Sequence, residues 1–249
     1  MHNKIIEGFK TDFLKIKEKG FIESHRLHNT GIGKTFEDLI GIYENNNRLA
    51  DYKGILELKS QRELSNSLIT LFTLVPTFPE NAMAYIRDTY GTIDKEFPNR
   101  KIIHSTAPHS KFNSYKEVYG FKLELDESRS RIFLKIKNLQ ANQIESIEIF
   151  WNFQELRKIV ESKCDYIAYI TAKTKRENGR EFFHFTDATI LSGLNFDKFL
   201  RLVKEDIIVF DIRYGVYRSG KKKGQSHDHG PAFRIAKRKL DHAFEIMKL

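Results

Sequence analysis

Two kinds of hydrophobic periodicity alternate along the chain, which favours a mixed α/β protein. Ile5–Lys19 and Thr35–Tyr43 carry apolar residues near a 3.6-residue period, so we expect a helix in each. Between them, the glycine-containing segment His28–Gly33 is expected to form a loop. Gly54–Lys59 alternates apolar and polar residues instead, and this pattern predicts a strand with Glu57 and Lys59 on one face.

The alternation continues through the rest of the chain. We expect helices at 81–90, 153–163 and 196–204, and strands at 68–74, 121–125, 131–136, 166–172, 182–185 and 207–214. The strands 121–125 and 131–136 form a hairpin through 126–130 in this prediction. Because no Gly-, Ser- or Pro-rich linker interrupts this order, it predicts one compact unit with a central sheet flanked by helices.

Composition narrows the class of protein. Apolar residues make up 40% of the sequence, as in ordinary globular proteins, and no segment approaches the ~20 apolar residues of a membrane span. Met1–Lys10 carries charges where a signal peptide needs an apolar run. We therefore expect a cytoplasmic protein without a membrane partner. The single cysteine, Cys164, lies in an apolar run and is expected to be a buried, inert thiol.

The excess positive charge is concentrated near the C-terminus. The chain has a net charge of +9, and Arg213–Lys239 alone contains nine basic residues and one acid, Asp228. A basic segment of this kind indicates a polyanionic partner, most often nucleic acid. A solvated basic tail is the alternative, but glycines, aromatic residues and histidines are interleaved with these charges.

The clearest chemical pattern is Asp51, Glu57 and Lys59. Strand alternation places Glu57 beside Lys59, and Asp51 just precedes the strand. Two carboxylates next to a lysine are suited to Mg²⁺. In phosphodiester hydrolysis such a metal polarises the phosphate and activates water, while the lysine stabilises developing charge. An exposed Glu–Lys pair on an edge strand is the structural alternative.

The helix before this pattern offers a third acid, Glu37. It could face the site, or it could be a surface glutamate favoured by the helix dipole. The nearby Gly31-Ile32-Gly33-Lys34-Thr35 resembles the end of a phosphate-binding loop. That motif requires glycine at position 28 and a strand upstream, and this chain has His28 and a polar segment. A nucleotide-binding loop is therefore not expected.

The basic segment contains side chains that recognise base edges in the major groove of DNA. Arg213 and Arg234 can donate to guanine, and Asp211 and Asp228 can accept from cytosine. Lys221, Lys222 and Lys223 are suited to phosphate contacts, which position a protein without specifying sequence. Two other interpretations stay open, namely a metal site at His227 and His229 and a basic loop without specificity. The remaining histidines, including His25, His28, His104 and His109, form no interpretable cluster in the sequence.

Taken together, these segments resemble the MvaI/BcnI group of type II restriction endonucleases, which are relatives of the mismatch-repair nicking enzyme MutH, and the MvaI branch is the more similar. The resemblance is carried, in order along the chain, by His28–Leu39, Glu57–Lys59 with Ser67–Thr73, and Ser219–Gly224 continuing through His227–Gly230 to Ala232–Arg234. It therefore spans nearly the whole chain.

The resemblance implies a PD-(D/E)xK, MutH-like fold in which two lobes surround a DNA cleft. The catalytic lobe would be built mainly around 1–90 and the recognition lobe would include about 206–249. It implies Mg²⁺, with Mn²⁺ able to substitute. The implied site residues are Asp51, Glu57, Lys59 and Glu37 for catalysis; Asp51, Glu57 and the Leu58 carbonyl for the metal; Asp211, Arg213, Tyr217, His227, Asp228, His229 and Arg234 for bases; and Lys34 and Lys221–Lys223 for phosphates.

The expected activity is metal-dependent, sequence-specific cutting of double-stranded DNA at a short pseudopalindromic site such as CCWGG. The resemblance also implies a monomer and a cognate DNA methyltransferase that is linked genetically and is not a bound subunit. Two alternatives remain at this point: a nicking enzyme of the MutH kind, and a sequence-specific DNA-binding protein without catalysis.

Overall fold

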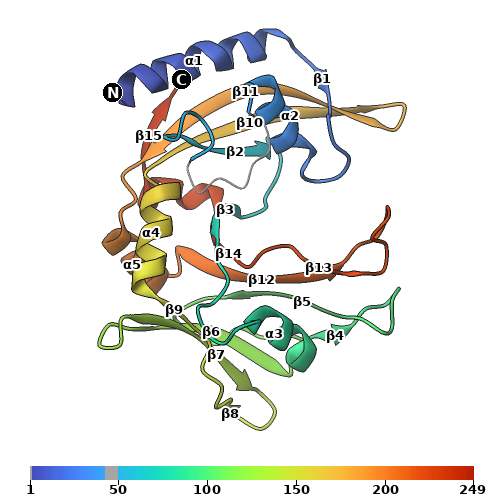
Figure 1. The fold of residues 1–249 in the computed structure, drawn as a ribbon, viewed down its shortest axis with the longest axis vertical. Coiled ribbons are helices and arrows are strands. Elements are labelled where there is room, and N and C mark those ends of the chain that lie inside the picture. Colours follow the sequence, from blue (N-terminus) through green and yellow to red (C-terminus); the bar gives the residue numbers. More distant parts are fainter. Residues whose placement is uncertain (1, 43–49) are drawn as a thin grey trace. The chain divides into compact units, whose positions relative to one another are not determined.

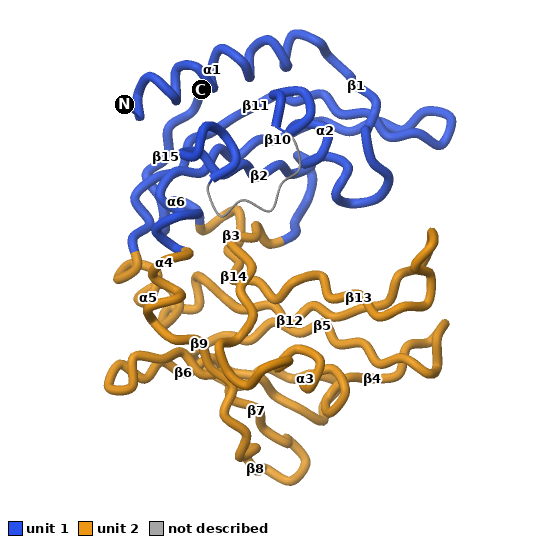
Figure 2. The backbone as a smooth tube through the Cα atoms, viewed as in Figure 1, with its two compact units in different colours: residues 1–67, 160–195, 240–249 blue, residues 68–159, 196–239 orange. Residues whose placement is uncertain are grey.

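The computed structural model describes residues 2–42 and 50–249, so Tyr43, the last residue of the predicted helix at 35–43, lies outside the described residues. The chain divides into two compact units (Figure 2). Unit 1 comprises 1–67, 160–195 and 240–249, and unit 2 comprises 68–159 and 196–239. Each unit is thus assembled from segments that are far apart in sequence. The assignment of catalysis and recognition to separate lobes stays a prediction.

Unit 1 is built on a mixed sheet. Strand β10 (Tyr166–Glu177) runs antiparallel to β11 (Arg180–Ser192) and parallel to β2 (Glu57–Arg62). The other elements of this unit are β1 (Ile22–Glu23) and β15 (Glu245–Lys248), which both pair with β11, and the helices α1 (His2–Glu18), α2 (Gly31–Leu39) and α6 (Leu240–Ala243).

The core of unit 1 confirms the helical periodicity of the N-terminal segment. Buried Phe9 and Phe13 from α1 pack against Phe36 of α2, which in turn contacts Phe185 of β11 at a ring-centroid distance of 5.0 Å. Figure 1 shows α1 lying along the sheet that contains β10 and β11. Burying aromatic rings of this size provides much of the hydrophobic free energy of the unit.

Among the predicted boundaries in unit 1 that differ from the structure, the starts of α2 and β2 lie nearest the candidate site. Helix α2 begins at Gly31, inside the segment expected to be a loop, and its first turn is closed by the Lys34 N–H group, which donates to the Thr30 carbonyl. Strand β2 begins at Glu57, three residues after the expected Gly54. Lys53 and Gly54 have positive φ and form a tight turn in which Tyr52 pairs with Leu56, so the chain cannot extend earlier.

Unit 2 contains two further sheets. The first sheet has six strands in the order β3-β14-β12-β5-β4, and β13 also pairs with β12. The second sheet has four strands in the order β6-β7-β8, and β9 also pairs with β7. The strands are β3 (Ile69–Thr73), β4 (Thr92–Ile93), β5 (Lys101–Ala107), β6 (Tyr119–Asp126), β7 (Arg131–Asn138), β8 (Gln143–Ile144), β9 (Phe150–Asn152), β12 (Ile208–Val216), β13 (Ser226–Asp228) and β14 (Ala232–Ile235). Its helical elements are α3 (Ala82–Tyr90), α5 (Phe196–Lys204) and the 3₁₀ turn Lys237–Lys239, and α4 (Phe153–Lys163) continues into unit 1.

Strand β12 lies in the middle of the six-stranded sheet and has two different faces. Phe210, on one face, packs against Trp151 at 4.6 Å between ring centroids and against Phe233 at 5.2 Å. Trp151 Nε1 also donates to the Leu74 carbonyl, which satisfies its one polar group. Because side chains alternate along a strand, the odd-numbered residues of β12, including Asp211 and Arg213, lie on the opposite face.

The structure confirms the environment predicted for Cys164, which is fully buried, and burial raises the pKa of its thiol to about 12. We therefore expect the native protein to resist alkylation, because the thiolate is the reactive form. A thiol-titrating disulfide reagent should modify less than about a tenth of the protein before unfolding, and all of it in denaturant. Rapid reaction of the native protein would contradict this burial.

No described helix is long and apolar enough to span a membrane.

Candidate active site

Asp51, Glu57 and Lys59 come together at the start of β2. Lys59 Nζ donates to Glu57 Oε1 at 2.7 Å, as expected for side chains two positions apart on a strand. Asp51 reaches the same strand through the turn at Lys53 and Gly54, and its Oδ2 accepts the backbone N–H of Leu58 at 2.9 Å. The sequence could place Glu57 and Lys59 by alternation, but the position of Asp51 depends on this turn.

The environment of Asp51 fits a divalent cation. Burial raises the pKa of the Asp51 carboxyl, and the negative charge of Glu57 raises it further, against the opposing effects of the Leu58 N–H and nearby lysines. Two carboxylates that repel each other in a partly buried site are stabilised by a cation between them. Their oxygens, with the Leu58 carbonyl as a further donor, are the ligand type that Mg²⁺ prefers, and Mg²⁺ commonly binds through one or two carboxylates.

Sequence reasoning missed one residue of this cluster, Lys163. It is the last residue of α4, and its Nζ donates to Glu57 Oε2 at 2.9 Å. Glu57 therefore has a lysine on each carboxylate oxygen, and its side chain is only 9% exposed. No local pattern in the sequence connects Lys163 with Glu57, because the contact depends on the pairing of β10 with β2.

The helix α2 carries the two other residues expected near this site. Lys34 Nζ pairs with Asp38 at 2.6 Å, and His25 Nδ1 lies 2.9 Å from the other oxygen of the same carboxylate. Glu37 is partly exposed on this helix. Throughout 2–42 and 50–249, no three His, Cys, Asp or Glu side chains form a group that could hold a metal. The catalytic role of Glu37 and the phosphate contact of Lys34 stay predictions.

Most of the residues expected to recognise bases gather on one face of the six-stranded sheet in unit 2, and Asp228 is the exception. Arg213 on β12 lies opposite His104 on β5, Asp211 lies opposite Thr106, and Gly215 lies opposite His227 on β13. Directly paired residues of antiparallel strands point to the same side of a sheet. We call this surface the polar face and define it by Asp211, Arg213, His227, His229, Arg234 and His104.

Arg213 is the cation of the polar face with the most unused hydrogen-bonding capacity. Its guanidinium donates no hydrogen bond to any residue that the structure describes, although it is partly buried. Burial and the neighbouring charge of Arg234 lower the Arg213 pKa, and Asp211 and Asp228 partly compensate. Because this partly buried guanidinium has no acceptor among the described residues, it is free to donate to an external acceptor, such as a guanine edge or a phosphate.

Arg234 and Asp211 form a pair on the same face. Arg234 donates to Asp211 Oδ2 at 2.6 Å and also to the Leu68 carbonyl, while Thr106 Oγ1 donates to Asp211 Oδ1 at 2.7 Å. Arg234 Nε is buried without a partner among the described residues. The pair is therefore held rigidly. Arg234 can contact a base only through guanidinium N–H groups that do not already donate to Asp211 or to the Leu68 carbonyl.

Tyr217, His227 and His229 form a ring stack at the edge of the polar face. Tyr217 and His227 are nearly parallel at 3.9 Å, and His229 follows at 4.0 Å from His227. Burial, chiefly, and the charge of His227 lower the His229 pKa to about 4, so His229 is neutral at neutral pH. Asp228 lies opposite Tyr214 and accepts the N–H of Gly230 at 2.8 Å, so it belongs to the other side of the sheet.

His104, which the sequence left unexplained, belongs to this surface. Its ring lies 5.8 Å from that of His229, and both rings approach Gly215, where a Cβ atom would come within 2.9 Å of His229 Nε2. Glycine at 215 thus lets two histidines lie over the backbone of β12. The described residues supply no third ligand for a metal at His227 and His229.

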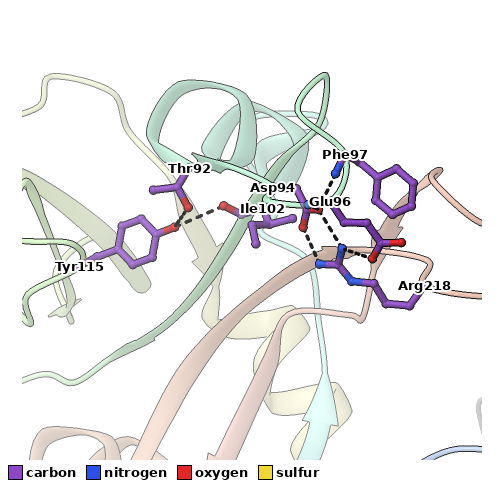
Figure 3. Close-up of polar contacts among 7 residues, drawn as sticks. All are labelled: Thr92, Asp94, Glu96, Phe97, Ile102, Tyr115 and Arg218. Carbon is purple, nitrogen blue, oxygen red and sulfur yellow. Dashed lines mark hydrogen bonds and ion pairs between the residues drawn. The ribbon is translucent and has the colours of Figure 1, made fainter.

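The loop that carries Lys221–Lys223 is anchored to a second loop by a buried acid (Figure 3). Asp94, with a side chain 1% exposed, accepts Arg218 Nη1 at 2.8 Å and also Arg218 Nη2. Asp94 also accepts the N–H groups of Glu96 and Phe97. The Arg218 guanidinium is the main cause that lowers the Asp94 pKa to about 2, so the pair is ionised at any physiological pH.

Replacing Asp94 by asparagine is expected to loosen this loop. The amide lacks the charge that holds Arg218, so we expect amide hydrogen exchange at Lys223–Gln225 to accelerate about tenfold. Hydrogen–deuterium exchange with mass spectrometry measures this. Asp126→Asn removes another Asp–Arg pair of unit 2, at the β6–β7 turn, and should leave that exchange unchanged. Equal protection in Asp94→Asn and wild type would contradict the anchoring role.

The mixed α/β architecture, the acid–acid–lysine cluster and the polar face with its adjoining lysines fit the class of site-specific nucleases. The chain belongs to the MvaI/BcnI restriction endonuclease family, whose model matches residues 10–244. The family predicted from the sequence is thereby confirmed, as is the mixed α/β class of the fold, although the described residues form three sheets and not one central sheet. Membership of this family makes the protein a type II restriction endonuclease.

Solved structures support the same conclusion. The chain is similar to restriction endonuclease MvaI in complex with its cognate DNA substrate, with 33% identity over 97% of each chain and a TM-score of 0.90. It is also similar to MvaI in the absence of DNA, with 33% identity over 96% of this chain and 95% of that one and a TM-score of 0.58. No curated protein matches the chain.

Proposed function

We propose that this protein cuts double-stranded DNA at a short, nearly palindromic sequence in a reaction that requires Mg²⁺, with Mn²⁺ as a substitute. The observation that carries the proposal is the meeting of Asp51, Glu57 and Lys59 at the start of β2. Support for the substrate comes from the similarity to MvaI, whose structure contains cognate DNA. A CCWGG-like site is the expectation that follows from this resemblance.

Each residue of the cluster has a defined task in this reaction. Asp51 and Glu57, with the Leu58 carbonyl, would hold the metal, which supplies positive charge at the phosphate and makes water a better nucleophile when bound. In hydrolysis, water oxygen bonds to phosphorus, one P–O ester bond breaks, and the departing oxygen takes a proton. Lys59, held by Glu57, is placed to orient the water and to stabilise charge on the phosphate oxygens.

The polar face would select the sequence. Arg213 would donate to a guanine edge, and Asp211 with Arg234, His227, His229 and Tyr217 would complete the contacts to bases from this face, whereas Asp228 lies on the other side of the sheet. His104 joins these candidates because of its position beside His229. The exposed side chains of Lys221, Lys222 and Lys223 would contact DNA phosphates. Lys34 on α2 would make a further phosphate contact.

We further propose that the protein is a cytoplasmic monomer and that a separate DNA methyltransferase protects the DNA of the same cell from cleavage. Digestion of a supercoiled plasmid tests the activity. Discrete linear fragments should form in Mg²⁺ and none in EDTA. Accumulation of nicked circles would favour a nicking enzyme of the MutH kind, and tight, salt-sensitive binding without any cutting would indicate a DNA-binding protein without catalysis.

A further inference from the structure

Glu57 is bound by two lysines that come from different parts of the chain. Lys59 Nζ lies 2.7 Å from Oε1, and Lys163 Nζ lies 2.9 Å from Oε2. The three side chains are 22%, 18% and 9% exposed for Lys59, Lys163 and Glu57. In a site this shielded from water, the Coulomb attraction between the opposite charges is larger than it is between surface ions.

The fold holds Lys163 in this position. Helix α4 ends at Lys163, Cys164 N–H still donates to the Val160 carbonyl, and the Cys164 side chain is fully buried. Strand β10 then begins at Tyr166 and pairs with β2, so that Ile167 lies opposite Glu57. The end of α4 is thus fixed next to the start of β2. Lys163 is held beside the Glu57 carboxylate by α4 on its N-terminal side and by β10 on its C-terminal side.

These contacts have a consequence for metal binding. Both oxygens of Glu57 are occupied by ammonium groups, while Asp51 close by experiences the charges of Glu57 and of both lysines. A divalent cation that binds Glu57 either displaces one ammonium or lies beside it. Both possibilities weaken metal binding, because the first breaks an ion pair and the second brings like charges together.

We infer that Lys163 is a positioning residue of the active site. It fixes the Glu57 carboxylate through an ion pair, and its positive charge opposes the binding of a divalent cation to that carboxylate. This inference rests on the proposed function, because it takes Glu57 as a metal ligand. Lys59 is the lysine of the acid–acid–lysine pattern, whereas Lys163 acts through Glu57. Lys163 therefore sets the metal concentration at which the site is filled.

Mn²⁺ binding to the protein without DNA tests the inference, with free Mn²⁺ measured by electron paramagnetic resonance. Lys163→Gln keeps a hydrogen-bond donor and removes the charge, so its dissociation constant for Mn²⁺ should be about tenfold lower than that of the wild type. Lys163→Arg keeps the charge and should bind Mn²⁺ like the wild type. Lys158→Gln, on the exposed side of the same helix, is the matched control and should also bind like the wild type.

The direction of the change separates this role from a structural one. If Lys163 only stabilised the fold, its removal would disorder the site and weaken Mn²⁺ binding. Equal or weaker binding by Lys163→Gln at a wild-type melting temperature therefore overturns the inference. If that variant does not fold, Lys163→Met, which keeps the length of the side chain without charge, is judged by the same criterion. Failure of the proposed function is distinguishable, since then the wild type and Glu57→Gln would bind Mn²⁺ equally.

Discussion

Replacing Lys59 by alanine is expected to slow DNA cleavage by about a hundred- to a thousandfold, because a single positioned donor at the reacting centre contributes this much to many enzymes. Lys59 is held by Glu57 at 2.7 Å and is 22% exposed, so it can still reach a phosphate. DNA binding should change by less than about threefold, since one phosphate contact among many is lost. Single-turnover cleavage and a filter-binding assay measure the two effects.

The chain supplies a matched control for Lys59→Ala. Lys175 and Glu177 form another lysine–glutamate pair two positions apart on a strand, at 2.8 Å, but in an exposed part of β10. Lys175→Ala should cut at the wild-type rate. Cleavage by Lys59→Ala within a factor of about three of the wild type would show that the cluster is an ordinary surface pair.

Replacing Arg213 by alanine is expected to remove discrimination at one base pair of the recognition sequence. Its guanidinium donates to no described residue, and a bidentate contact to guanine provides about 1–3 kcal/mol of discrimination against other bases. Cleavage of the preferred site should therefore slow by about ten- to a hundredfold, while sites changed at that base pair are affected much less. Competition cleavage of the preferred and singly changed sites measures this ratio.

A lysine of the neighbouring loop provides the contrast. Lys222→Ala should weaken binding to all sequences alike and reduce the salt dependence of binding, because a phosphate contact carries no sequence information. Equal losses on preferred and random DNA for Arg213→Ala would assign Arg213 to phosphate binding and contradict its role in base recognition.

The elements that the sequence predicted well are those with a strong local pattern. The periodic apolar residues of α1 and the strand alternation at Glu57 and Lys59 are local properties, and the structure confirms both. Strands β5 and β14 were not predicted. Strand β14 has only four residues, and β5 has two adjacent apolar residues, Ile102 and Ile103, followed by three polar ones, so neither shows a clear two-residue alternation.

The candidate site shows that contacts between residues distant in sequence cannot be predicted from local patterns. Asp51 could be proposed from its spacing, but its approach to Glu57 depends on the turn at Lys53 and Gly54. Lys163 could not be found, since 106 residues separate it from Glu57 and only the parallel pairing of β10 with β2 joins them. The anchoring of Arg218 by Asp94 is likewise a contact between distant loops that no local pattern indicates.

Sequencing the DNA ends that the protein produces tests the central claim most directly. A plasmid library with randomised inserts is incubated with the wild type and with Glu57→Gln, in Mg²⁺ and in EDTA. We predict that wild-type ends in Mg²⁺ fall at a fixed position within one short, nearly palindromic sequence, and that the other three reactions yield no such ends. Ends scattered over unrelated sequences, or the same ends from Glu57→Gln or in EDTA, would contradict the account.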